Sequence, residues 1–195
     1  STPIKSSAAS DVYKRQALYY EAKKYFANIL WPYARLIDKA IAKIAGFDIR
    51  IIAPSHGVIW RTNASEIIDL YSKWGRGVCD GSLVIAYDSM WGGTEKIARA
   101  IARGAQRAGV EVKVFKMSNT PNSTVSTEVF TCSGLLVGSP TLNSGMLPTI
   151  GSLLVYLKGL NPIGKKVATF GTFGWAGGAQ KDMEEILLKF NKEVM

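Results

Sequence analysis

A short stretch, "YDSMWGGTEK" (residues 87–96), has the residue types of a phosphate-binding turn. Ser89 and Thr94 lie five positions apart, on either side of Gly92 and Gly93. The glycines let the backbone turn sharply, and a helix starting here would aim its first N–H groups at the point that the hydroxyls face. This arrangement suits a phosphate. The stretch has neither a G-x-G-x-x-G nor a Gly-Lys-Ser/Thr pattern, which disfavours a dinucleotide and excludes a P-loop.

Two later loops have residues that suit a flat ligand. The loop "GSPTLNSG" (138–145) turns at a proline and supplies Asn143, whose side chain both donates and accepts hydrogen bonds. The loop "FGTFGWAGGA" (170–179) sets Phe173 and Trp175 among glycines. Glycines allow a ligand to approach the backbone closely, and aromatic rings can stack on it.

Each loop follows an apolar segment that we predict to be a strand. The predicted strands span residues 82–89, 110–117, 133–140 and 165–174, and the predicted helices between and after them span 94–109, 146–160 and 179–190. Alternating strands and helices indicate an α/β fold with a parallel sheet covered on both faces. The sequence supplies four predicted strands for this sheet.

Ligands of open parallel sheets bind beyond the carboxyl ends of the strands. Any one of the three loops is ordinary turn chemistry, but together they favour flavin mononucleotide (FMN). Its phosphate would lie in the first loop and its ring between the other two. The predicted cofactor-binding residues are Ser89, Met90, Trp91, Gly92, Gly93, Thr94, Pro140, Thr141, Leu142, Asn143, Thr172, Phe173, Gly174, Trp175 and Gly177.

The region before the predicted sheet has a different pattern. We predict helices over 17–30, 32–46 and 65–77, a strand over 48–53 and a linker over 76–81. Residues 1–16 are small and polar without a period, and we interpret them as a non-native or disordered tail. This division gives an upstream piece over 17–75 and the α/β domain over 82–195.

His56, in "APSHGVIWR", is the only histidine in the chain. A lone histidine is more often a hydrogen-bonding or surface group than a metal ligand. Cys79 and Cys132 form no CxxC pair, which favours two reduced thiols in a cytoplasmic protein. No segment approaches the roughly 18 apolar residues of a spanning helix, and no secretory signal is visible. We therefore expect a soluble protein without membrane contact.

The formal net charge is +9, but the basic residues are scattered. No basic run is interleaved with aromatic residues, so we expect no nucleic-acid partner. An acidic redox partner fits the charge better.

Several of these stretches resemble a known family. "YDSMWGGTEKIA", "GSPTLNSGMLP" and "FGTFGWAGGA" resemble the flavodoxin-like domain of the flavodiiron proteins (A-type flavoproteins). "YYEAKKYFANILWPY" and "IIAPSHGVIWR" are similar to the end of the metallo-β-lactamase-like αββα domain that precedes it there. The resemblance covers about residues 17–195. It implies a flavodoxin-like, doubly wound sheet of five strands in the order 2-1-3-4-5. The chain supplies four of those strands, so the fourth would be an exposed edge. The resemblance differs at Gly93, where the family often has a serine.

The resemblance implies FMN in one domain and a non-haem diiron centre in the other, with His56 as the last histidine ligand. Such proteins are oxidoreductases that reduce dioxygen to water or nitric oxide to nitrous oxide. Electrons come from rubredoxin or a related reductase, and a head-to-tail homodimer brings each FMN to the partner's irons. The resemblance leaves the substrate and the donor open.

The family's H-x-E-x-D motif is absent from this chain. One histidine cannot hold two irons, so we interpret the chain as an internal fragment that is inactive by itself. The main alternative is a flavodoxin-like electron-transfer module without metal chemistry. An FMN-dependent quinone or NAD(P)H oxidoreductase would not explain "APSHGVIWR". A basic nucleic-acid binder would require salt-dependent binding, which no motif suggests.

Overall fold

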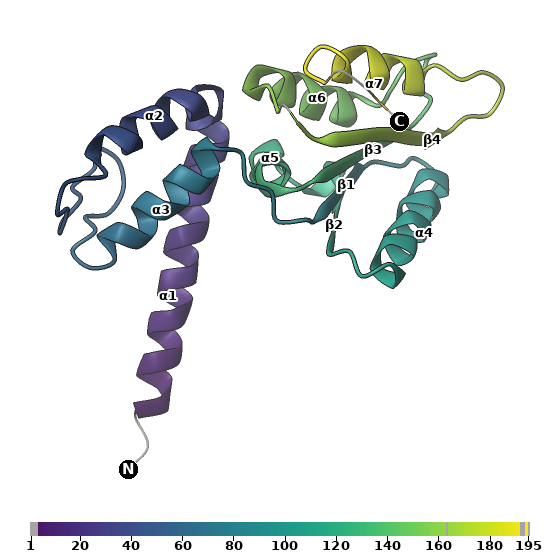
Figure 1. Cartoon of the computed structure of the whole chain (residues 1–195). Helices are drawn as coiled ribbons and strands as arrows, with labels where there is room; N and C mark the ends of the chain where they lie inside the picture. The colour runs from purple at the N-terminus through teal and green to yellow at the C-terminus, as the bar shows by residue number, and fades with distance from the viewer. Residues whose placement is uncertain (1–3, 163, 192–193, 195) are drawn as a thin grey trace. The chain divides into compact units, whose positions relative to one another are not determined.

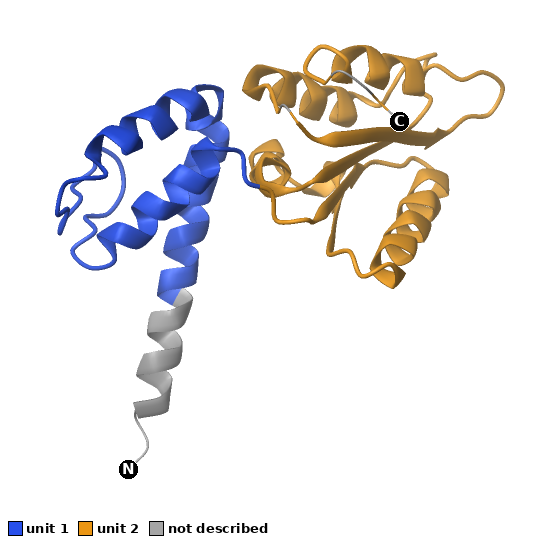
Figure 2. Cartoon of the chain, viewed as in Figure 1, with its two compact units in different colours: residues 1–78 blue, residues 79–195 orange. Residues whose placement is uncertain are grey.

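The computed structural model describes residues 4–162, 164–191 and 194, with side chains from residue 14 onward. The chain divides into two compact units, residues 1–78 (unit 1) and 79–195 (unit 2), which Figure 2 shows in different colours. The boundary between the units falls inside the segment 76–81, where the sequence predicts a linker.

Unit 2 is built on a parallel four-stranded sheet in the order β2-β1-β3-β4 (Figure 1). Its strands are β1 (Leu83–Tyr87), β2 (Val112–Lys116), β3 (Gly134–Pro140) and β4 (Lys166–Thr172). The predicted flavodoxin-like order is confirmed for these four strands. In the register, Tyr87 lies opposite Gly138, and Pro140 lies opposite Thr172. The carboxyl ends of β1, β3 and β4 therefore share one edge of the sheet.

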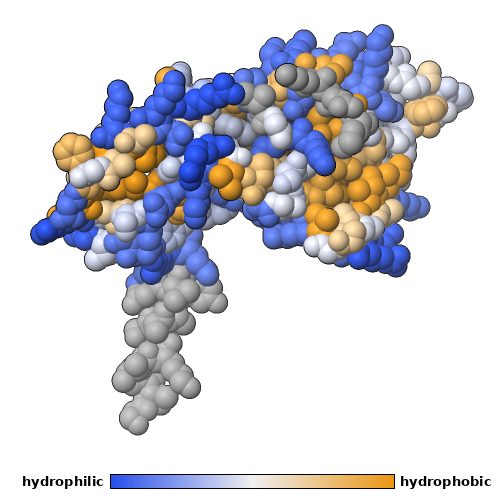
Figure 3. Space-filling model, viewed as in Figure 1, coloured by the Kyte–Doolittle hydropathy of each residue, from blue (hydrophilic) through white to orange (hydrophobic). Residues whose placement is uncertain are grey.

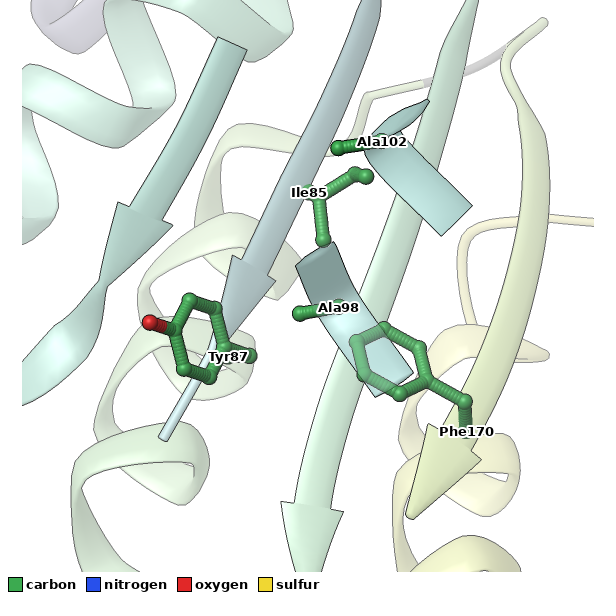
Figure 4. Packing of buried hydrophobic residues seen from close by; sticks show 5 residues of the cluster. All are labelled: Ile85, Tyr87, Ala98, Ala102 and Phe170. Carbon is green, nitrogen blue, oxygen red and sulfur yellow. The ribbon is translucent and has the colours of Figure 1, made fainter. Parts of the chain in front are cut away.

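Helices cover both faces of this sheet. They are α4 (Gly93–Arg107), α5 (Asn122–Thr131), α6 (Pro148–Leu160) and α7 (Ala179–Leu187). Helix α4 contacts all four strands from one side, while α5, α6 and α7 pack in sequence on the other (Figure 1). Under α4, a cluster joins β1 and β4 to the helix; its buried residues are Ile85, Tyr87, Ala98, Ala102 and Phe170 (Figure 4).

The packing of this core explains why β3 has a glycine at position 138. A Cβ atom at Gly138 would collide with the ring of Phe170 on β4. The aromatic ring thus lies directly over the β3 backbone, and only glycine leaves it room. Opposite α4, four side chains of α6 are fully buried: Ile150, Leu153, Leu154 and Leu157.

Helix α5 is an element that the sequence analysis did not predict. Its sequence, "NSTVSTEVFT", is rich in β-branched and hydroxyl residues, which have low helix propensity. Burial of residues 125–130 compensates for that propensity. The Thr127 hydroxyl is satisfied within the helix, because it donates to the Ser123 carbonyl at 2.6 Å.

Unit 1 is helical in its described part. It contains α1 (Ile4–Tyr25), a π-helical turn (Phe26–Leu30), a 3₁₀ turn (Trp31–Tyr33), α2 (Ala34–Ile44) and α3 (Ala64–Gly75). Phe26 packs edge-on against Tyr71, with ring centroids 5.1 Å apart, and also contacts Trp74. A Cβ atom at Gly75 would lie 2.9 Å from the Asp38 Cβ, so α2 and α3 approach closely there.

Two predictions for unit 1 were wrong. The predicted strand over 48–53 is absent, and a single antiparallel bridge joins Ile52 to Trp60. A strand requires a ladder of partners, and unit 1 has no strand among its described residues. The unstructured tail over 1–16 is also contradicted from Ile4 onward, because α1 begins there. Extending an anchored helix adds one hydrogen bond per residue, without a new nucleus. Residues 1–3 lie outside the described residues, and a non-native origin stays a prediction.

Among the described residues, no helix is both long enough and apolar enough to cross a membrane.

Candidate functional site

The loop after β1 contains a buried hydroxyl group without a partner. The backbone N–H of Ser89 donates to the Asp88 carboxyl at 2.9 Å, but the Ser89 Oγ atom has no hydrogen-bond partner among the described residues. A buried unpaired hydroxyl costs about 1–3 kcal/mol unless a ligand completes it. The left-handed Gly92, at φ +79°, ends the loop, and α4 begins at Gly93. The first N–H groups of a helix lack intrahelical acceptors and attract anions.

Thr94 connects this loop to the end of β4. Its side chain is fully buried, and its Oγ1 atom lies 3.0 Å from the Thr172 Oγ1 atom. Because a hydroxyl can donate once and accept twice, Thr94 retains capacity for a ligand. A Cβ atom at Gly93 would lie 3.3 Å from the Thr172 methyl carbon, so a serine there would need that side chain to shift.

The loop after β3 is a tight turn held from two sides. Leu142 and Gly145 exchange backbone hydrogen bonds of 2.9 Å around Asn143 and Ser144, which have φ values of +49° and +63°. The Thr141 N–H donates to the Thr172 carbonyl at 2.8 Å. The loop is therefore fixed to β4, although its Asn143 side chain is exposed.

The loop after β4 packs against the preceding loop. A Cβ atom at Gly178 would collide with the Ser144 carbonyl, so glycine permits this close backbone contact. Phe173 and Trp175 are exposed, and so is Trp91 of the first loop, at 93%. Exposed aromatic rings on loops that share one sheet edge can stack on a flat ligand.

The charges beside the first loop are partly neutralised. Glu95, in the first turn of α4, is bonded by Arg99 at 2.7 Å and approached by Lys116 at 3.5 Å. The hydrogen bond from Arg99, aided by both positive charges, lowers the pKa of Glu95 below its usual value. The Glu95 carboxylate thus has cationic partners, which weaken its repulsion of an anion at the helix start.

The three predicted loops lie at one edge of the sheet, but their side chains differ in burial. Ser89 and Thr94 supply buried hydroxyls, whereas the aromatic residues face solvent. The individual ligand contacts stay predictions. Sequence reasoning missed Asp88 and Thr149, whose side chains bond each other at 2.7 Å. The signal for Asp88 was a carboxyl residue directly after a buried apolar run.

His56 lies in a different environment, in unit 1. It is exposed, it lines a mainly apolar cavity of about 750 Å³, and its ring centroid is 6.3 Å from that of Tyr25. Among the described residues, no three His, Cys, Asp or Glu side chains are grouped to hold a metal ion. These residues alone do not fit a diiron centre, and the ligand role of His56 stays a prediction.

Comparisons with known proteins identify a family and relatives of the chain. A family model described as flavodoxin matches residues 85–194. The chain is 46% identical over 169 residues to a nitric oxide reductase of Moorella thermoacetica, covering 86% of this chain and 42% of that protein.

Two solved structures are similar over most of the chain. The flavodiiron protein of Giardia intestinalis matches with a TM-score of 0.87 and 30% identity, over 93% of this chain and 45% of that one. The rubredoxin oxygen:oxidoreductase of Desulfovibrio gigas matches with a TM-score of 0.82 and 36% identity, over 86% and 43%. The chain spans less than half the length of each of these three relatives.

Proposed function

The chain belongs to the flavodoxin family, and on this premise we propose that unit 2 binds FMN in the three-loop site and transfers electrons. The observation that carries the proposal is the buried, unpartnered Ser89 hydroxyl next to the start of α4. Ser89, Thr94 and the first N–H groups of α4 would hold the phosphate. The loops around Asn143 and Trp175 would border the ring and limit its contact with water.

FMN, when bound, supplies the capacity to accept and release electrons singly or in pairs. The residues of this chain bind and orient it. Hydrogen bonds to an ionised phosphate are worth about 1.5–3 kcal/mol each, so two hydroxyls and a helix start would favour FMN over riboflavin.

Reconstitution tests this function directly. The chain would be mixed with excess FMN and desalted, and its flavin absorbance compared with its protein absorbance. We expect about one flavin per chain, and none with a heat-unfolded control. A chain that is folded by circular dichroism but emerges colourless would disprove FMN binding.

For the whole protein we propose a flavodiiron oxidoreductase. In this proposal FMN passes electrons to a non-haem diiron centre that reduces dioxygen to water or nitric oxide to nitrous oxide, and His56 is one iron ligand. Support comes from two relatives whose names specify nitric oxide reduction and rubredoxin oxygen:oxidoreductase activity. By the same likeness we propose rubredoxin or a related reductase as donor and a head-to-tail homodimer as the assembly.

The 195-residue chain itself is proposed not to assemble the diiron centre, because no three His, Cys, Asp or Glu side chains among the described residues are grouped to hold a metal ion. After anaerobic incubation with ferrous iron and desalting, the chain and its His56→Ala variant should retain equally little iron. Two irons per chain, lost in the variant, would overturn this proposal.

A second candidate is an FMN electron-transfer module without metal chemistry. The exposed His56, which has no grouped ligands among the described residues, favours it. The two candidates differ in the full-length protein: iron analysis should find about two irons per chain for the oxidoreductase and none for the module.

A further inference from the structure

Asp88 is a buried carboxyl residue at the start of the first of the three loops. It follows directly after β1 and is only 4% exposed. Its Oδ1 atom accepts the Ser89 backbone N–H at 2.9 Å, and its Oδ2 atom accepts the Thr149 hydroxyl at 2.7 Å. Its own N–H donates to the Gly138 carbonyl at 3.1 Å. Asp88 thus connects the first loop to the start of α6 and to β3.

Burying the Asp88 carboxyl group costs free energy, so its position calls for a structural or binding role. None of the ion pairs among the described residues includes Asp88, so no ion pair offsets the burial of this carboxyl group. Buried carboxyl groups without an ion-pair partner are expensive to maintain. This one also lies beside a loop that suits an anionic ligand, where a negative charge would repel the ligand.

The hydrogen bonds suggest what the role is. By accepting the Ser89 N–H, Asp88 fixes the peptide that carries the unpartnered Ser89 hydroxyl. Thr149 lies in the first turn of α6, a packed helix, and anchors the other carboxyl oxygen. The peptide that carries the Ser89 side chain is thereby fixed before any ligand arrives, and preorganisation of this kind increases affinity.

We propose that Asp88 is a positioning residue for the flavin phosphate, acting through Ser89 and anchored by Thr149. It does not touch the phosphate itself. This inference rests on the proposed function, and it adds that phosphate recognition depends on a buried carboxyl group that acts through its neighbour in the loop.

The chain offers a conservative replacement that separates hydrogen bonding from charge. In Asp88→Asn, the amide oxygen still accepts the Ser89 N–H, and the amide nitrogen donates to the Thr149 hydroxyl, which can accept. Both links survive and a negative charge is removed. Asp88→Ala removes both links. Thr149→Val removes the anchor while keeping a β-branched side chain of similar shape.

The test measures the dissociation constants of FMN and riboflavin for the full chain and the three variants. Riboflavin lacks the phosphate but has the same ring. Asp88→Ala should weaken FMN binding about tenfold or more and riboflavin binding less than about threefold. Thr149→Val should also weaken FMN binding more than riboflavin binding, but by a smaller factor than Asp88→Ala. Asp88→Asn should bind FMN at least as tightly as the unaltered chain.

Three results would overturn the inference: unchanged FMN affinity in Asp88→Ala, an equal loss of both flavins, or an Asp88→Asn variant as weak as Asp88→Ala. If circular dichroism shows that Asp88→Ala does not fold, the Thr149→Val variant provides the test. A ratio of FMN affinity to riboflavin affinity that is the same in Thr149→Val as in the unaltered chain would then contradict the proposal. An unaltered, folded chain that binds neither flavin would instead sink the proposed function itself.

Discussion

At the scale of single residues, we expect the Ser89 hydroxyl to destabilise the flavin-free chain and to strengthen flavin binding. It is buried without a partner in this structure, and a buried unsatisfied group is destabilising. Ser89→Ala should therefore leave the free energy of unfolding of the flavin-free chain unchanged or raise it by up to about 1 kcal/mol. It should weaken FMN binding by about 1–3 kcal/mol, because a hydrogen bond to a charged phosphate is lost.

Urea unfolding and flavin titration of the same variant measure both effects. Ser118→Ala, a change at an exposed position of unit 2, is the matched control and should alter neither. A Ser89→Ala variant that destabilises the flavin-free chain yet binds FMN normally would place the phosphate elsewhere.

The two cysteines differ in reactivity for a physical reason. Cys132 is fully buried, and burial raises the pKa of its thiol to about 12, whereas Cys79 is exposed. Only the thiolate attacks a disulfide reagent. At pH 8 the native chain should therefore react with one equivalent of an aromatic disulfide reagent, and the denatured chain with two. A Cys79→Ser variant should show no rapid reaction, and a rapid second equivalent in the native chain would contradict the burial of Cys132.

At the scale of elements, Asp80 fixes the entry to β1. Its Oδ1 atom accepts the Ser82 hydroxyl at 2.6 Å and the Ser82 N–H at 2.9 Å. Burial alone would raise the pKa of Asp80, but these hydrogen bonds and the charge of Lys113 lower it below its usual value. Because the folded pKa lies below the unfolded one, the stabilisation is present above the unfolded value of about 3.9 and is lost as pH falls through the folded value.

Unfolding in urea at several pH values tests this linkage. The urea concentration at the midpoint of unit 2 unfolding should fall as pH decreases from about 5 to about 3. Asp80→Asn should reduce that fall, while Glu185→Gln, at an exposed carboxyl of α7, should leave it unchanged. A curve for Asp80→Asn that runs parallel to that of the unaltered chain would show that Asp80 does not contribute.

Elements with a local signal could be predicted, and those that depend on partners could not. The buried strand before Asp88 and the amphipathic α4 each carry their pattern in their own residues. Helix α5 forms although its residues have low helix propensity, because burial of residues 125–130 stabilises it. The segment 48–53 has a strand pattern, but Ile52 finds only Trp60 as a partner. The chain positions of the site loops followed from strand ends, whereas the Asp88–Thr149 contact joins residues 61 positions apart.

At the scale of the whole molecule, the two units differ in how much of the proposed function their own residues can supply. Unit 2 has a sheet with helices on both faces, and the loops of the proposed site all belong to it. Unit 1 has an apolar cavity of about 750 Å³ lined in part by His56, and no three of its described His, Cys, Asp or Glu side chains are grouped to hold a metal ion. The flavin chemistry is therefore the part of the proposed function that this chain can be tested for directly.

The most direct test is a fluorescence titration of FMN and riboflavin with the purified chain. The account predicts saturable quenching of FMN fluorescence at one flavin per chain, and binding of riboflavin at least about tenfold weaker, because the Ser89 and Thr94 hydroxyls and the start of α4 have no phosphate to hold. Equal affinity for the two flavins, or no quenching of FMN by a chain that is folded by circular dichroism, would contradict a phosphate site at the end of β1.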